Sequence, residues 1–325
     1  MKAWYDACTG KHVRYAIAVA RRLRTLGHEV ILTTRQHPDT LALAELLEED
    51  FLIVGRYSPD SALSRLKGSL ERQLAFCERF GDKPPHLAIS HGSVDLIRVA
   101  FGLRIPSIST ADAPHAIAAN RLGLPLVDIL LASKAIPLEE YERFGVKRIE
   151  RFAGVDEVAW VKNYPLKPKN YKRPLIVVRQ METKASYAEK KQDITERIAM
   201  KLSNHGNVMF IPRYDKRPRK KLIIPHKLID SVNLSAAADL VISVGGTISR
   251  EAALQGTPSI VVQTFGQSYV NDYLSKLGFP LFTVQPSQII KRAKQYLGQK
   301  WDTKKQLKQL ENPVDYVEKL TQEIF

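Results

Sequence analysis

Short apolar runs alternate along the chain with longer segments in which apolar residues recur at helical spacing. The segment 13–26, for example, has apolar residues at positions 13, 16, 17, 19, 20, 23 and 26, and Gly27 follows it as a helix terminator. Short apolar runs stand on both sides of this segment. A strand, a helix and a second strand in this order form a βαβ unit, which predicts a parallel sheet with right-handed crossovers.

The same alternation continues through both halves of the chain. In the first half we expect strands at 2–7, 29–34, 51–54, 87–90, 106–109 and 129–132, and helices at 13–26, 40–48, 61–80, 94–101 and from 112 onward. In the second half we expect strands at 175–178, 208–211, 221–225, 240–244, 259–262 and 281–284, and helices at 187–205, 233–238, 247–255, 269–277 and 287–297.

This pattern predicts two doubly wound α/β domains, which cover residues 1–163 and 175–303. Residues 164–174 are rich in proline and lysine and lack periodicity, so we interpret them as a linker. Residues 304–325 are charged and helical in pattern, and this segment could pack across both domains.

The most informative turn lies between the apolar runs 240–244 and 259–262. Gly245 and Gly246 follow the first run, Thr247 is expected to cap a helix, and Gly256 with Pro258 ends it. A glycine turn before a helix N-terminus lets backbone N–H groups approach an anion closely. The stretch therefore predicts a site for a nucleoside diphosphate, although a turn of this kind also serves ordinary βα packing.

Charge and composition narrow the class of partner. The 325 residues include 49 Lys and Arg against 34 Asp and Glu, a formal charge of +15 that favours anionic ligands. The densest basic run, 216–221, is most simply a solvated loop. The chain has no helix-turn-helix pattern, zinc-ligand spacing or aromatic platform, so nucleic acid is not an expected partner.

Cysteine content and hydropathy indicate in which cellular compartment the protein is found. Two cysteines, Cys8 and Cys77, are too few for a disulfide framework and suit a reducing compartment. No apolar run is long enough to span a membrane, and the N-terminal residues lack a signal-peptide pattern. We expect a cytoplasmic protein, with peripheral association at the anionic inner face of the membrane as a further possibility.

Two motifs resemble those of known sugar-processing enzymes. Residues 9–12 (TGKH), followed by a helix and by 27–30 (GHEV), resemble the first βαβ unit of MurG-type glycosyltransferases, which carry Thr-Gly-Gly-His there. Residues 243–258 (SVGGTISREAALQGTP) are similar to their nucleotide-sugar motif and to the glycine turn of UDP-N-acetylglucosamine 2-epimerases. The resemblance implies the GT-B fold, in which two Rossmann-like, doubly wound parallel-sheet domains face each other across a cleft.

The chain as a whole resembles an archaeal and bacterial family catalogued only as a domain of unknown function. Residues 98–107 (RVAFGLRIPS) and 250–259 (REAALQGTPS) carry that resemblance. These motifs specify the fold better than the reaction.

The resemblance implies a donor site for a nucleoside-diphosphate sugar, expected to be a UDP-sugar. Backbone N–H groups of the glycine turn would hold phosphate oxygens, and Glu251 would accept hydrogen bonds from ribose hydroxyls, unless it only complements the helix N-terminus. Cationic side chains would neutralise the leaving group. The candidate binding residues are Gly10, Lys11, Arg179, Lys184, Ser243, Gly245, Gly246, Thr247, Glu251, Gln267 and Asn271.

His12 is the candidate general base, which would deprotonate the acceptor hydroxyl. The alternative is a structural histidine that caps the turn. Lys11 replaces the second glycine of the family motif, so it either weakens the approach of a ligand or meets a phosphate itself. His91 and Asp112 are further catalytic candidates, and His115 and Asn120 are candidates on the acceptor side, although Asp112 could equally be a helix cap.

The leading hypothesis is a metal-independent glycosyltransferase that acts on an unknown acceptor, such as a lipid-linked or cell-surface glycan. No Asp-x-Asp motif for a metal is present, and no cofactor is expected. A UDP-sugar 2-epimerase or hydrolase is the alternative; it could recruit Asp6, Glu182 and His91, but Arg250 stands where epimerases carry the first residue of a Glu-Glu pair. A basic nucleic-acid-binding protein or a non-catalytic binding protein is a more remote alternative.

Overall fold

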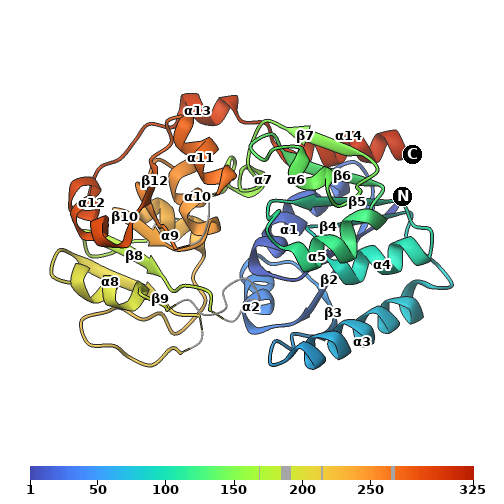
Figure 1. The fold of residues 1–325 in the computed structure, drawn as a ribbon, viewed down its shortest axis with the longest axis horizontal. Coiled ribbons are helices and arrows are strands. Elements are labelled where there is room, and N and C mark those ends of the chain that lie inside the picture. Colours follow the sequence, from blue (N-terminus) through green and yellow to red (C-terminus); the bar gives the residue numbers. More distant parts are fainter. Residues whose placement is uncertain (168, 184–191, 214, 265–267) are drawn as a thin grey trace. The chain divides into compact units, whose positions relative to one another are not determined.

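The computed structural model describes residues 1–167, 169–183, 192–213, 215–264 and 268–325. The chain divides into two compact units (Figure 1), Met1–Trp160 with Glu311–Phe325, and Val161–Leu310. Residues 164–174, the expected linker, belong to the second unit, where the Tyr164 hydroxyl donates a 2.6 Å hydrogen bond to Asp230.

The first unit is built on a seven-stranded parallel sheet with the order β3-β2-β1-β4-β5-β6-β7. Its strands are β1 (Lys2–Ala7), β2 (Glu29–Gln36), β3 (Leu52–Arg56), β4 (Leu87–Ser90), β5 (Ser107–Ala111), β6 (Ile129–Ser133) and β7 (Ile149–Phe152). Its helices are α1 (Gly10–Thr25), α2 (Pro38–Leu46), α3 (Ala62–Phe80), α4 (Val94–Gly102), α5 (Ile117–Gly123), α6 (Glu139–Glu142) and α14 (Pro313–Ile324), while α7 (Val158–Val161) lies at the boundary with the second unit and the 3-10 turn η1 spans Leu124–Leu126.

The second unit has a five-stranded parallel sheet with the order β12-β11-β10-β8-β9. Its strands are β8 (Leu175–Arg179), β9 (Asn207–Ile211), β10 (Leu240–Ser243), β11 (Ser259–Val262) and β12 (Leu281–Val284). Its helices are α8 (Thr195–Leu202), α9 (Ser231–Ala237), α10 (Thr247–Leu254), α11 (Tyr269–Lys276), α12 (Ile289–Tyr296) and α13 (Lys304–Gln309), with the 3-10 turn η2 at Pro286–Gln288.

Local sequence explains most of these boundaries. Thr9 is the N-cap of α1 and accepts a hydrogen bond from the His12 backbone N–H, and Gly27 follows the helix with a φ of 80°. The strands β4, β6 and β10 are buried along their whole length, as their apolar runs predict, and β5 is buried as well although its sequence, SISTA, is largely polar.

Several expectations about elements were wrong. The helix expected from residue 112 begins at Ile117, and within the described residues the helix expected at 187–205 covers Thr195–Leu202. The pattern missed β7, whose sequence IERF is only partly apolar. The expected tail helix is interrupted: α13 ends at Gln309, and α14 begins at Pro313 with Asn312 as its N-cap. Residues 221–225 make only an isolated bridge between Met209 and Ile223. The helix α14 packs on α1 and β6 of the first unit.

A buried ion pair fixes α3 against the first sheet. Arg72 of α3 donates to both carboxylate oxygens of Asp6 on β1, at 2.5 and 2.8 Å, and to the Val54 carbonyl. Burial would raise the pKa of the Asp6 carboxyl, but the Arg72 charge and the hydrogen bonds from Arg72, Ser93 and Thr33 leave it lowered. Because Asp6 is fully buried and fully bonded, it is a structural residue and is not available to a substrate.

Candidate functional site

The first unit gathers its polar candidates at the carboxyl edge of its sheet. Strand order reverses between β1 and β4, because β1 leads to β2 on one side and β4 leads to β5 on the other. Ligands of open α/β sheets bind outside the carboxyl ends of strands at such a switch point. Lys11 and His12 lie in the first turn of the helix after β1, and His91 and Asp112 directly follow β4 and β5.

Lys11 connects two carboxylates at this edge. Its ammonium lies 2.5 Å from Asp112 and 2.6 Å from Asp156, which follows β7. Asp156 is 4% exposed, and the Lys11 side chain is 11% exposed. The ion pairs of Lys11 are therefore largely desolvated. Lys11, which stands where the MurG-type motif has glycine, holds together the segments that follow β1, β5 and β7.

His91 belongs to the same cluster. Its Nδ1 lies 2.6 Å from the Thr110 hydroxyl, and its Nε2 lies 3.2 Å from Asp112 and 3.8 Å from Asp156. The structure thus brings together Lys11, His91 and Asp112, which the sequence proposed from separate segments. Asp156 was missed, because the strand that delivers it was not recognised.

His12 lies beside this cluster with one ring nitrogen unpaired. Its ring packs edge-on against His91 at a centroid distance of 4.8 Å, and its Nδ1 is buried with no hydrogen-bond partner among the described residues. Burial and the neighbouring His91 and Lys11 hold the pKa of the His12 imidazole well below its usual value. The imidazole is therefore neutral at neutral pH, the form that a general base requires.

The remaining acceptor-side candidates have other environments. Asn120 is buried and donates to the Ala113 and Pro114 carbonyls, so it ties the loop before α5. His115 is exposed. Asp112 is not a helix cap, since Ala116 is the N-cap of α5 and the Asp112 carboxylate contacts Lys11 and His91 instead.

The second unit also has its candidate turn at a switch point. Strand order reverses between β8 and β10, and the glycine turn follows β10. Gly245 is exposed, and a Cβ added to it would meet nothing within 4 Å. The N-cap of α10 is Gly246 rather than the expected Thr247, and no side chain caps the helix. The start of α10 therefore offers backbone N–H groups beside open space, as an anion site requires.

The interior side of the same turn is filled. A Cβ on Gly246 would collide with the Arg250 guanidinium, which is 5% exposed and donates a 3.3 Å hydrogen bond to Asn271. Ser243 donates to the Gly245 carbonyl and lies 2.7 Å from the Ser249 hydroxyl. Glu251 is fully buried, so a ribose could reach its carboxylate only if the side chains that cover it move.

Two other polar residues of this unit can be placed. Arg179 ends β8, next to β10 in the sheet, and its guanidinium donates to the Pro212 carbonyl. Glu182 pairs with Arg213 at 3.5 Å. The candidates Lys184 and Gln267 lie outside the described residues. Gly10 begins α1, where an added Cβ would meet only Leu43 at 3.6 Å.

His91, Asp112 and Asp156 also have the donor atoms of a metal site. One ligand atom from each lies within 4.8 Å of the others. Imidazole and carboxylate ligands suit a divalent transition metal. The Lys11 ammonium contacts both carboxylates, however, so positive charge is already supplied at this point.

Among the helices of the described residues, none combines the length and the apolar composition that a membrane-spanning segment needs.

These two doubly wound parallel sheets, each with its candidate residues after the switch-point strands, define a protein of the GT-B fold. Its similarity to solved structures extends over nearly the whole chain. The UDP-GlcNAc 2-epimerase of Methanocaldococcus jannaschii, solved with UDP-GlcNAc and UDP, has a TM-score of 0.70 at 14% identity, with 99% of each chain covered. The glycosyltransferase SnogD of Streptomyces nogalater has a TM-score of 0.61 at 17% identity and covers 100% of this chain and 99% of its own.

The chain belongs to the family described as "Protein of unknown function (DUF354)", whose family model matches residues 1–324. The uncharacterized protein MJ0665 of Methanocaldococcus jannaschii is 29% identical over 333 residues, which cover 97% of this chain and 96% of that protein. The expected family and fold are thereby confirmed.

Proposed function

We propose that this protein is a glycosyltransferase that moves a sugar from a nucleoside-diphosphate sugar, expected to be UDP-linked, to a hydroxyl group of an acceptor. The observation that carries the proposal is His12, in the first turn of the helix that follows β1: its imidazole is half-buried, has a lowered pKa, and has one buried nitrogen that is unpaired among the described residues. The UDP-sugar enzyme and the glycosyltransferase among the structural neighbours support this class of donor.

In the proposed reaction His12 takes the proton of the acceptor hydroxyl. The acceptor oxygen forms a bond to the anomeric carbon, and the bond between that carbon and the phosphate oxygen breaks. The nucleoside diphosphate leaves with the electron pair of the broken bond. We assign its phosphates to the backbone N–H groups after β10, with Arg179 as a further source of positive charge, and we propose no metal for this step.

Lys11, His91, Asp112 and Asp156 would hold the acceptor side. Two carboxylates that share one ammonium keep further lone pairs for sugar or polyol hydroxyls. A lipid-linked or cell-surface glycan at the inner face of the membrane fits this proposal as acceptor, and a cytoplasmic location fits the donor.

The second candidate is a UDP-sugar 2-epimerase or hydrolase. The observation that favours it is the number of acid–base groups in one cluster, since His12, His91, Asp112 and Asp156 exceed what one proton transfer requires. The structural similarity to a UDP-GlcNAc 2-epimerase points in the same direction.

Mass spectrometry of the products separates these reactions. The protein is incubated with a panel of UDP-sugars, with and without a mixture of glycan acceptors. Release of UDP that depends on an acceptor supports the transferase, an isomeric UDP-sugar supports the epimerase, and UDP with free sugar in the absence of acceptor supports the hydrolase. If no product forms and UDP does not raise the melting temperature, the proposal is rejected.

A further inference from the structure

A row of exposed leucines runs along the outer face of α3. Leu63, Leu66, Leu70 and Leu74 are 54–61% exposed, and the exposed Cys77 continues the row. Residues at these spacings share one face of a helix. The opposite face of α3 is anchored by Arg72, Phe76 and Phe80, so the row is held rigidly on the surface. Soluble monomers seldom expose a continuous apolar stripe of this kind.

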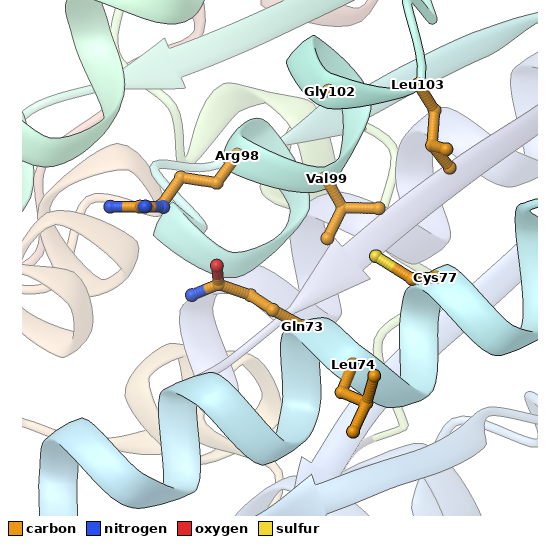
Figure 2. Close-up of a pocket in the computed structure, with 7 residues that line it drawn as sticks. All are labelled: Gln73, Leu74, Cys77, Arg98, Val99, Gly102 and Leu103. Carbon is orange, nitrogen blue, oxygen red and sulfur yellow. The ribbon is translucent and has the colours of Figure 1, made fainter.

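A groove lies beside the C-terminal half of this row. It has a volume of about 480 Å³ and runs between α3 and α4. Figure 2 shows Cys77 and Leu74 on α3 and Val99, Gly102 and Leu103 on or directly after α4, with Gln73 and Arg98 also lining it. The row therefore has projecting leucines at its N-terminal end and a hollow at its C-terminal end.

The spacing of the row is the same read in either direction. The steps from residue 63 to 77 are three, four, four and three, so the row is symmetric about Leu70. A two-fold axis that passes between the Leu70 residues of two copies would place Leu66 of one copy level with Leu74 of the other, and Leu63 level with Cys77. Leu63 and Leu66 of each copy would then lie over the groove of the other copy. The same contact would occur two times, as a self-complementary interface requires.

The charges beside the row fit a second copy better than an anionic membrane. Lys67, Glu71 and Glu78 are exposed on the same side of α3 as the leucines, and the exposed Arg98 of α4 lines the groove. The two carboxylates oppose contact with an anionic lipid surface. In an antiparallel pair about Leu70, Lys67 of one copy comes within one turn of Glu71 of the other, so the flank is complementary to itself.

We propose that two copies of this chain form a two-fold symmetric dimer in which their α3 helices pair antiparallel about Leu70. The proposal is independent of the reaction, because none of these residues belongs to the candidate site.

Sedimentation velocity on the purified full chain gives the first test. We expect a dimer, and we expect Leu70→Glu to weaken dimerisation by about tenfold or more, because two carboxylates would be buried against each other at the axis. Leu46→Glu, which changes an exposed leucine of α2, is the matched control and should leave the dimer intact. A monomeric wild-type chain, or a dimer insensitive to Leu70→Glu, would overturn the proposal.

Cross-linking tests the antiparallel arrangement. Burial raises the pKa of the Cys8 thiol to about 11, which leaves Cys77 as the reactive thiol. Mild oxidation of Leu63→Cys should give a covalent dimer that disappears when Cys77→Ser is added. A covalent dimer that persists in the double variant would indicate parallel helices and contradict the proposal. Binding to phosphatidylglycerol vesicles that depends on Leu70, without dimerisation, would show that the row meets a membrane instead.

Discussion

The Lys11 ammonium lies 2.6 Å from the Asp156 carboxylate and 2.5 Å from that of Asp112, so one residue of α1 joins the loops that follow β5 and β7. The motif that the first segment resembles carries glycine at this position. In this chain the position instead carries a positive charge, held within a cluster of acid–base groups. Its neighbour His12 is kept neutral partly by that charge.

Removal of the lysine should create a metal site. We expect Lys11→Ala to bind Mn²⁺ or Zn²⁺ at least about tenfold more tightly than the wild type, because His91 and two carboxylates are left without their cation. Isothermal titration calorimetry measures this directly. Lys11→Arg keeps the charge and serves as the control; equal affinities in all three proteins would show that the three side chains do not act as a ligand set.

Loss of the His12 imidazole should remove turnover and leave the binding of UDP intact. We expect His12→Ala to lower the rate of product formation by about 10²–10⁴-fold, the contribution of a general base. The rise in melting temperature with UDP should persist, since the nucleotide is assigned to the second unit. His86→Ala is the control, because His86 precedes β4 at the other edge of the sheet. Unchanged turnover in His12→Ala would leave His12 a structural residue.

The pH dependence follows from the lowered pKa of His12. The unfolded chain has a histidine of pKa about 6.5, so between that pH and the lower folded value the unfolded state binds more protons. Stability from this group is therefore present above about pH 6.5 and is lost as the pH falls toward the folded pKa. The acid limb of kcat/KM should lie below pH 6.5; a limb at or above that value would contradict a neutral, buried base.

Two adjacent glycines should respond differently to alanine. Gly245→Ala adds a methyl group to open space, so the melting temperature should be unchanged. The affinity for UDP should fall, because the methyl group would occupy space that the phosphates are proposed to fill. Gly246→Ala pushes into the buried Arg250 guanidinium and its hydrogen bond to Asn271, and we expect a loss of about 1–3 kcal/mol in the free energy of unfolding. Denaturant titration and UDP titration measure the two effects. Full UDP affinity in Gly245→Ala would place the phosphates elsewhere.

Glu251 offers a test of the ribose assignment. Glu251→Gln keeps the shape of the side chain and removes its charge. If the carboxylate binds ribose hydroxyls, the UDP-induced thermal shift should fall while the unliganded melting temperature stays within a few degrees of the wild type. A large loss of stability with an unchanged UDP shift would assign Glu251 to the interior of the second unit, where it is fully buried.

Alternation of apolar runs and helical segments predicted six of the seven strands of the first sheet and all five strands of the second, because most buried parallel strands are apolar runs and each helix that covers them has an apolar face. The helix α3, expected at 61–80, is found at Ala62–Phe80. The strand β7 was missed for the same reason: its residues are largely half-buried, and its sequence carries no apolar run.

The sequence by itself determined the family, the fold class and the two turns that carry the candidate chemistry, since these depend on local residue order. Only the tertiary structure decided that Lys11, His91, Asp112 and Asp156 form one cluster, because they lie up to 145 residues apart and meet only where parallel strands end at one edge. Tertiary packing likewise decided that Asp6 is committed to Arg72 and that Glu251 is enclosed. Burial and pairing depend on distant parts of the chain, and no local pattern records them.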